Sequence, residues 1–403
     1  MKGFRTHLIL AALVCTASLT ARAQEFRVFN RSVQVHGSLS QGFAYSNDNN
    51  FLTMKTSDGS PAFTDGALNL STSITDKFHV AAQAYDRKVG QLDDFRPQLD
   101  FAYGDYRFVS WFGVRAGQVK TPLGLYNDTQ DADFLHTWAL LPQGVYPLDL
   151  RSTMLSHTGV DIYGRIPLKK AGKLAYAAYA GERSFDNRGG YYIFSSDLGM
   201  PITSASGRVT GWDLRWTTPL KGLTLGSSWI DMTQNRDGSY SQAMFPPHTA
   251  YKATSAPERT TVGYGDFQRG KWDFAGEYRA EDYWLSILTP SFGNSVFLWN
   301  GSNESWFLAG SVHAMKRLSL GVYHSNFHVD VPADPANKAT NHIYDEVATA
   351  RLDLNRFWTV KAEEHFMDGY GDLYSAHGFY ERSNPNGFKP RTDMLMLRTS
   401  FFF

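Results

Sequence analysis

The chain lacks the features that mark several common protein classes. Its 403 residues include a single cysteine, and beyond residue 23 no stretch approaches the roughly 20 apolar residues of a membrane-spanning helix. No G-x-S-x-G elbow, Walker loop, H-E-x-x-H motif or dinucleotide fingerprint occurs. Basic and acidic residues are equal at 39 each, whereas nucleic-acid binders show a basic excess. The absences argue against a helical membrane protein, a nucleic-acid binder and enzymes recognised by local motifs.

The N-terminal residues have the pattern of a cleaved secretory signal. Two basic residues precede an apolar run from Leu8 to Cys15, and a small-x-small site ends at Ala23. We therefore predict a signal peptide at 1–23 and a mature chain at 24–403. A lipoprotein interpretation of Cys15 is weaker, because the preceding Leu-Val lacks the small residue of a lipobox. Removal of the signal leaves no cysteine for a disulfide or a thiolate metal site.

Alternation of apolar and polar residues is what the chain has in abundance. Aromatic residues make up 15% of it, and 35 glycines are spread among short segments. Period-two alternation bounded by turn residues predicts strands, at 33–46, 62–74, 77–87, 96–109, 111–120, 158–168, 172–182, 209–219, 222–231, 260–268, 271–282, 304–314, 317–328, 344–354, 357–367 and 392–403. The prediction is an all-β, antiparallel, 16-stranded transmembrane barrel, because the strands are near the roughly 9–11 residues that span a bilayer.

The connections between these strands alternate in length. The short ones are Thr75-Asp76, Ser110, Lys169-Lys170-Ala171, Leu220-Lys221, Gly270, Met315-Lys316 and Asn355-Arg356. The long ones are 47–61, 88–95, 121–157, 183–208, 232–259, 283–303, 329–343 and 368–391. Short turns at one end and long loops at the other are typical of bacterial barrels, in which they face the periplasm and the exterior.

Charged residues on one face of the strands predict a wet interior. In strand 209–219, for example, Leu214 and Trp216 alternate with Asp213 and Arg215, and successive side chains of a strand point to opposite faces. Full charges are not buried dry without partners. A barrel of 16 to 18 strands leaves an aqueous channel, so the inward face is expected to line a pore.

The chain ends on Phe401, Phe402 and Phe403, and in this it resembles Gram-negative outer-membrane porins, whose terminal Phe signals to the barrel-assembly machinery. The segment 115–127 also resembles the strand-to-loop junction of proteobacterial porin-like proteins that are distantly similar to phosphate-selective porins. The dense loop arginines and lysines of those anion channels are not found. The resemblance implies a bacterial outer-membrane protein in contact with lipid and lipopolysaccharide, a homotrimer, and energy-free diffusion of small hydrophilic solutes. It implies no enzyme activity and no cofactor.

The longest connection, 121–157, occupies the place of the third loop of classical 16-stranded porins, which folds into the barrel and narrows it. It is rich in large apolar residues that are unlike those of a solvated loop. A short helix is predicted from Asn127 to about Leu141, where Pro142 ends it.

Opposed charges are predicted at the constriction. The loop supplies Asp128, Asp131, Asp133 and Asp149, with Arg151. The alternation places eight basic residues of the predicted strands on the inward face: Arg87, Arg115, Lys120, Arg165, Arg215, Arg279, Arg351 and Arg398. Acids facing bases across a narrow point would set a transverse field that discriminates among solutes. The alternative is that the arginines pair with wall acids such as Asp161, Asp213, Glu277 and Asp353.

Other functions remain open. Asp128-x-x-Asp131-x-Asp133 invites a calcium site, but the sixth and twelfth positions lack the Gly and Glu of an EF-hand, and no metal site is expected. Glu363-Glu364-His365 is interpreted as interfacial polar residues. The rival functions are an outer-membrane hydrolase with a Ser–His pair on the wall, and a non-conducting adhesin or structural barrel. Phospholipid hydrolysis would identify the first, and absence of conductance the second.

Overall fold

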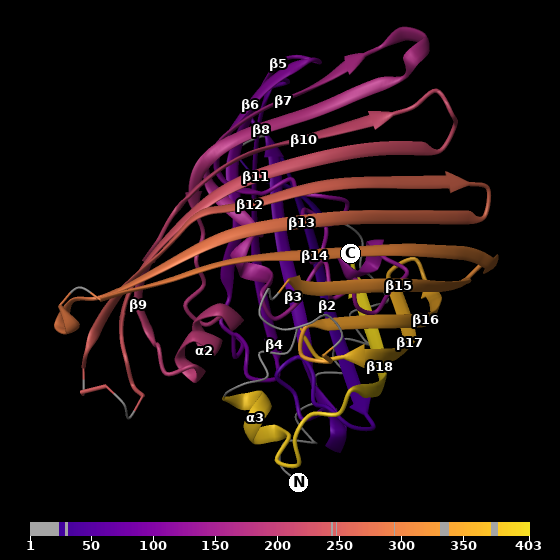
Figure 1. Cartoon of the computed structure of the whole chain (residues 1–403). Coiled ribbons are helices and arrows are strands. Elements are labelled where there is room, and N and C mark those ends of the chain that lie inside the picture. Colours follow the sequence, from indigo (N-terminus) through magenta and orange to yellow (C-terminus); the bar gives the residue numbers. More distant parts are fainter. Residues whose placement is uncertain are drawn as a thin grey trace.

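A closed ring of β-strands dominates the protein (Figure 1). The computed structural model describes residues 24–28, 31–242, 245–246, 248–293, 295–330, 338–371 and 378–403. The predicted signal segment 1–23 lies outside these residues. The strands are β1 (Gln24–Val28), β2 (Arg31–Ser46), β3 (Ser60–Ser73), β4 (Phe78–Val89), β5 (Gln98–Val109), β6 (Phe112–Lys120), β7 (Ser156–Pro167), β8 (Lys173–Arg183), β9 (Ile202–Ser206), β10 (Arg208–Thr217), β11 (Leu223–Ser239), β12 (Ala250–Arg269), β13 (Trp272–Thr289), β14 (Ser295–Met315), β15 (Leu318–Asp330), β16 (His342–Asn355), β17 (Trp358–Gly369) and β18 (Arg391–Phe402).

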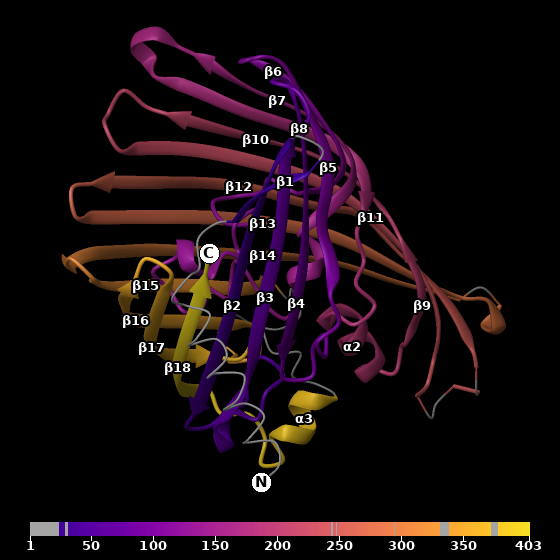
Figure 2. The same cartoon turned by 180° about the vertical axis from the view of Figure 1, so that it is seen from behind.

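Sixteen of these strands form the wall, each antiparallel to its neighbours. The ring runs from β2 to β8 and from β10 to β18, and it closes where β18 pairs with β2, with Phe401 opposite Leu39. The short strands β1 and β9 add to β2 and β11 respectively, and Figure 2 shows β1 beside β2. The prediction of a 16-stranded antiparallel barrel is confirmed.

The alternation in the sequence becomes two faces of the wall. In β10, Leu214 and Trp216 are 39% and 37% exposed on the outside, whereas Asp213, which directly precedes Leu214, is 5% exposed. The apolar face therefore points away from the barrel axis and the polar face points inward, as a barrel in lipid requires.

The two ends of the barrel differ in their connections. At the turn end, strands are joined through 74–77, 110–111, 168–172, 218–222, 270–271, 316–317 and 356–357. At the loop end, the connections are 47–59, 90–97, 121–155, 184–207, 240–249, 290–294, 331–341 and 370–390. The predicted long loops 232–259 and 283–303 are wrong, because β11 to β14 continue through most of them as paired strands. Alternation missed these extensions, in which Val296 to Trp299 expose apolar side chains on both faces.

Helices are few and lie at the connections. The α-helices are α2 (Gly190–Asp197) and α3 (Phe379–Ser383), and the 3-10 turns are η1 (Thr56–Asp58), η2 (Asp133–Leu135), η3 (Arg151–Thr153), η4 (Lys169–Ala171) and η5 (Pro290–Phe292). Among the described residues, no helix is long and apolar enough to cross a membrane.

An apolar core fills part of the interior near the loop end. Residues of loop 47–59 and of α3, including Phe51 and Tyr380, pack there against Leu140 of the connection 121–155 and against the inner face of the wall. Polar contacts hold the same region together: Asn50 Nδ2 donates to the Ser383 carbonyl at 2.8 Å. The connection 121–155 is therefore supported from the loop end by other loops.

Candidate pore constriction

The connection between β6 and β7, residues 121–155, lies inside the barrel, and it is called the inserted loop below. Its two ends are held together where it enters: the Thr121 N–H donates to the Leu155 carbonyl at 2.9 Å. The buried Asn127 amide donates to the carbonyls of Thr121 at 2.8 Å and Met154 at 3.0 Å. These bonds close the neck of the loop beside the wall.

The next part of the loop reaches β13 on another side of the barrel. Glu277 accepts a hydrogen bond from the Leu125 N–H at 2.7 Å and one from the Tyr146 hydroxyl. Gly124 turns the chain at this contact with a φ of +65°, and a Cβ there would lie 2.4 Å from Oε1 of Glu277. Only glycine suits this close approach and positive φ.

The middle of the loop is fastened to β17. Nζ of the fully buried Lys361 donates to the carbonyls of Asp133 at 2.7 Å and Trp138 at 2.8 Å, and it pairs with the Asp133 carboxylate at 2.8 Å. Glu363 accepts the N–H groups of Ala139 and Leu140, both at 2.9 Å. Wall side chains thus satisfy backbone groups that a helix would have satisfied internally.

The predicted helix from Asn127 to about Leu141 is consequently wrong. Only the 3-10 turn η2, Asp133–Leu135, forms there. Asn127, the first residue of the predicted helix, instead bridges the two ends of the loop.

The loop also contacts β5 and β6 through four charged side chains, Asp100, Lys120, Asp131 and Arg151, called the charge quartet below. Lys120 lies 3.2 Å from Asp100 and also pairs with Asp131, and Arg151 lies 2.8 Å from Asp100 and also pairs with Asp131. Each carboxylate therefore meets both cations, and none of the four side chains is more than 12% exposed. The quartet ties the beginning and end of the loop to the wall.

Cavities lie on both sides of the inserted loop. On the turn side are two, of ≈ 760 and ≈ 540 Å³, which share Arg165, Ala175 and Arg215 as lining residues. Toward the loop end, cavities of ≈ 830 and ≈ 240 Å³ are lined in part by Arg151 and Leu140 respectively. The quartet stands between two of them, because Lys120 lines the ≈ 760 Å³ cavity while Asp100 and Arg151 line the ≈ 830 Å³ one.

The charges of the loop are shifted by burial and by these partners. Burial opposes ionisation of Asp133, but the adjacent Arg398 and Lys361 outweigh it and hold its pKa at about 2. Burial likewise opposes ionisation of Asp131, yet Arg151 and Lys120 keep its pKa well below the usual range. Both acids are therefore ionised and paired across the whole physiological range.

Two other loop groups are shifted toward their neutral forms. Burial lowers the pKa of His136 to about 4, so its imidazole is neutral near pH 7, and Nε2 lies 3.0 Å from the Thr129 carbonyl. Burial raises the pKa of Asp149 to about 6, against the opposing effect of Arg87.

Comparison with known proteins rests on structure alone. No family model and no curated protein matches the sequence. Among solved structures, OmpT, an outer membrane protein of Vibrio cholerae, superposes with a TM-score of 0.56 at 10% identity, covering 94% of this chain and 100% of that one. The anion-selective porin from Comamonas acidovorans gives 0.56 at 10%, covering 93% and 100%. OmpF of Salmonella typhi gives 0.54 at 12%, covering 94% and 100%.

The chain has the fold of the outer-membrane porins. The resemblance inferred from its C-terminal strand and its loop pattern is confirmed at the level of fold. In this porin-type barrel, the inserted loop follows the fifth wall strand, β6, as predicted from the sequence.

Most of the predicted constriction residues contact one another directly, loop residue to wall residue. Asp133 contacts Arg398 at 3.0 Å, and Asp128 lies 3.8 Å from Arg215. Arg351 donates to the His136 carbonyl at 2.8 Å. The acids Asp131 and Asp133 therefore anchor the loop and present no unpaired charge to the cavities.

The alternative pairing of wall arginines with wall acids is also present. The pairs are Arg115–Asp161 at 3.8 Å, Arg215–Asp213 at 3.1 Å, Arg279–Glu277 at 3.2 Å and Arg351–Asp353 at 2.9 Å. Arg87, a further predicted wall residue, pairs with Asp93. Among the predicted basic residues, Arg165 differs: the described part of the chain gives it no ion pair, and it lines both turn-side cavities.

Sequence reasoning missed Asp100, Lys361 and Glu363. The interpretation of Glu363 and His365 as interfacial is wrong, because both are 1% exposed, and His365 lies 2.8 Å from Asp345 and 3.1 Å from Glu363 inside the barrel. The sequence pattern could have placed them, since Lys361, Glu363 and His365 are at every second position and therefore share one face of the strand. Among the described residues, no group of acids and histidines could hold a metal ion.

The raised pKa of Asp149 predicts a pH-dependent stability. Because the folded pKa, about 6, exceeds the unfolded value, the stabilising contribution is complete below about pH 4 and is lost as pH rises to 6. Asp149→Asn should remove this loss and make the protein more stable than wild type at pH 8, by about 3 kcal/mol at most. Urea unfolding of both proteins at pH 4 and pH 8 measures the difference, with the more exposed Asp128→Asn as the matched control. An equal pH dependence in wild type and Asp149→Asn would refute the assignment.

Proposed function

We propose that the protein is an outer-membrane porin that lets small hydrophilic solutes and ions diffuse down their gradients, with a passage set by residues 121–155. The observation that carries the proposal is the placement of the loop. It is bonded to β13, to β17 and to the β5–β6 side of one closed barrel, and charged cavities lie on both of its faces. A loop held across a water-filled barrel narrows the passage for solutes but leaves it open, unlike a separate domain that fills the barrel.

The remaining features of the proposal follow from the same fold. The long connections would face the exterior and the short turns the periplasm, with lipid and lipopolysaccharide around the apolar belt. A homotrimer is supported by the trimer form described for Vibrio cholerae OmpT, which has a TM-score of 0.52 to this chain at 8% identity. Delivery by the barrel-assembly machinery through Phe403, and export by the signal at 1–23, belong to the same proposal. Nucleic acid is not a proposed partner.

No bond is made or broken in this proposal. A hydrolase would need a nucleophile, a base and an orienting acid within reach of substrate. His157 lies 3.0 Å from the Thr121 hydroxyl and 2.8 Å from Asp161, but all three residues are at most 2% exposed. The pair His313–Ser319, at 2.8 Å, has no hydrogen-bonded carboxylate on the histidine within the described residues. These arrangements favour a structural role.

The experiment is reconstitution of the detergent-purified protein in planar bilayers. Discrete open-channel steps in 1 M KCl are expected, and swelling of proteoliposomes in a panel of small sugars, amino acids and carboxylates would then identify the solutes that pass. Complete absence of conductance from correctly folded protein would favour the adhesin or structural barrel. Phospholipid hydrolysis by the same preparation would favour the hydrolase.

A further inference from the structure

Three inward-facing residues on neighbouring strands mark the place where the two turn-side cavities meet. Arg165 of β7 lies opposite Ala175 of β8, and Ala175 lies opposite Arg215 of β10. Since neighbouring strands are about 4.8 Å apart, the two arginine backbones are separated by roughly 10 Å with only a methyl group between them. All three residues line both cavities, so space is left between the two cationic side chains.

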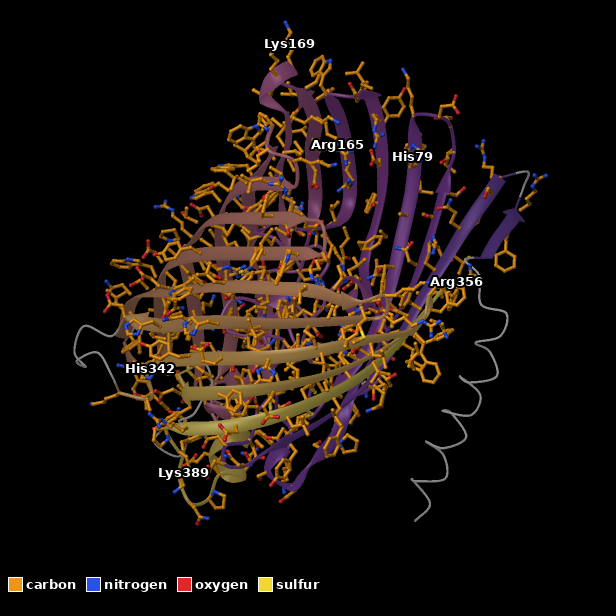
Figure 3. The ribbon with its side chains drawn as sticks, turned by 90° about the vertical axis from the view of Figure 1, so that its right-hand side faces the viewer. His79, Arg165, Lys169, His342, Arg356 and Lys389 are labelled. Atoms are coloured by element: carbon orange, nitrogen blue, oxygen red, sulfur yellow. The ribbon has the colours of Figure 1, made fainter. Side chains whose placement is uncertain are left out.

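The two arginines differ in their surroundings. Arg215 has carboxylate partners, Asp213 at 3.1 Å and Asp128 at 3.8 Å, and it also donates to the Gly124 carbonyl at 3.0 Å. Arg165 has no ion pair within the described residues, and neither does Lys173, which lines the ≈ 540 Å³ cavity beside it. Figure 3 shows Arg165 on the wall below the turn that carries Lys169.

The same side of the barrel carries further unpaired positive charge. Lys77 and Arg107 line the ≈ 760 Å³ cavity with Arg165, and no ion pair is made by either of them in the part of the chain that the structure describes. We call Lys77, Arg107, Arg165 and Lys173 the basic wall. They come from the turn before β4 and from β5, β7 and β8 respectively.

Acidic residues near the basic wall are mostly neutralised. Of the four acids that line the ≈ 760 Å³ cavity, Asp128, Asp161 and Asp213 pair with arginines. The fourth, Asp76, lies in the β3–β4 turn. Other acids, Asp266 and Asp273, line only the ≈ 540 Å³ cavity and belong to β12 and β13, away from the basic wall.

The electrostatic potential on the β4–β8 side of the two turn-side cavities is therefore positive. An aqueous cavity enclosed by low-dielectric walls focuses such a field and raises the local concentration of counter-ions. Guanidinium and ammonium groups without a carboxylate partner can bond a carboxylate or an inorganic anion that enters.

We propose that the basic wall is a binding site for the anionic groups of small solutes, and that it makes the channel prefer anions over cations. This inference rests on the proposed channel function and adds the class of solute. Tyr103, Tyr163 and Tyr176 line the same cavity, so a small carboxylate with a short carbon chain would find apolar contact there as well as the positive charge.

The test compares wild type with the double variant Arg165→Gln/Lys173→Gln. The reversal potential across a bilayer with a KCl gradient should give wild type a chloride-to-potassium permeability ratio above one, and the double variant should lose roughly half of it or more. Lys169→Gln is the matched control, because it removes the same kind of charge at the turn end but from outside both cavities. It should leave the ratio nearly unchanged.

A second measurement keeps the site testable without conductance. Calorimetric titration of the detergent-solubilised protein with succinate should show binding to wild type that is weakened several-fold in the double variant, as expected for a lost charge pair. A conducting channel that prefers potassium, a ratio unaffected by the double substitution, or equal succinate binding by both proteins would overturn the anion site. Absence of conductance together with succinate binding that depends on Arg165 and Lys173 would reject the channel and retain the site.

Discussion

Replacement of Asp131 by alanine is expected to raise the single-channel conductance by roughly twofold or more, with the barrel still folded. Asp131 is the loop carboxylate of the charge quartet and pairs with both Lys120 and Arg151. Its loss leaves two buried cations to share Asp100. Removing one partner from a buried ion pair typically costs about 3–5 kcal/mol, and release of the loop from β6 avoids most of that cost.

The wall does not depend on Asp131. The strands β5, β6 and β7 are held by their own ladders of backbone hydrogen bonds, which the substitution leaves intact. The quartet, by contrast, separates the ≈ 760 and ≈ 830 Å³ cavities. Its opening should therefore join them and widen the passage.

Single-channel recordings of Asp131→Ala and wild type measure the effect, and circular dichroism with resistance to protease checks the fold. Asp128→Ala is the matched control from the same loop. The Asp128 side chain is 38% exposed, and its contact with Arg215 is long, at 3.8 Å. This substitution should change the conductance little. Equal conductance of Asp131→Ala and wild type would show that the quartet is no barrier.

An arginine at Leu214 is expected to destabilise the protein by about 2–4 kcal/mol, the cost of placing Arg at the bilayer midplane on the lipid face of a barrel. Leu214 is 39% exposed on the outer face of β10, where lipid would be its only solvent. The same substitution at Thr217, three residues further along β10, places the guanidinium in the ≈ 540 Å³ cavity instead.

Urea unfolding in lipid vesicles provides the comparison. Thr217→Arg should cost much less than Leu214→Arg, because water in the lumen solvates the new charge. Equal costs at the two positions would mean that the outer face of β10 is not in contact with lipid, and the membrane placement of the barrel would then fail.

Strand alternation predicted the wall because each wall strand meets lipid on one side and water on the other. Asp213 and Leu214 are consecutive residues and lie on opposite faces, as predicted. The signal fails where that contrast ends. At the loop end of β14, Val296 to Trp299 are exposed on both faces, and pairing with β13 continues there through backbone bonds that carry no side-chain pattern.

The loop was harder to predict than the wall. Its apolar content indicated that it enters the barrel, but its helical pattern was misleading, because Lys361 and Glu363, more than 200 residues away in the chain, bond its backbone. Local propensity is a weak prior when tertiary partners satisfy the same groups. The pairing of Asp131 with Lys120 and Arg151 could not be inferred for the same reason.

Local periodicity was sufficient for the strand count and for the direction of most wall side chains, since two solvents act on every strand separately, and the alternation of short and long connections then indicated the barrel. Which inward charges are neutralised and which are left free depends instead on contacts between distant segments. Asp133 and Arg165 look alike as candidate charges in the sequence. Only the folded chain shows that Lys361 and Arg398 pair with Asp133, while Arg165 lines the ≈ 760 Å³ cavity without a carboxylate partner among the described residues.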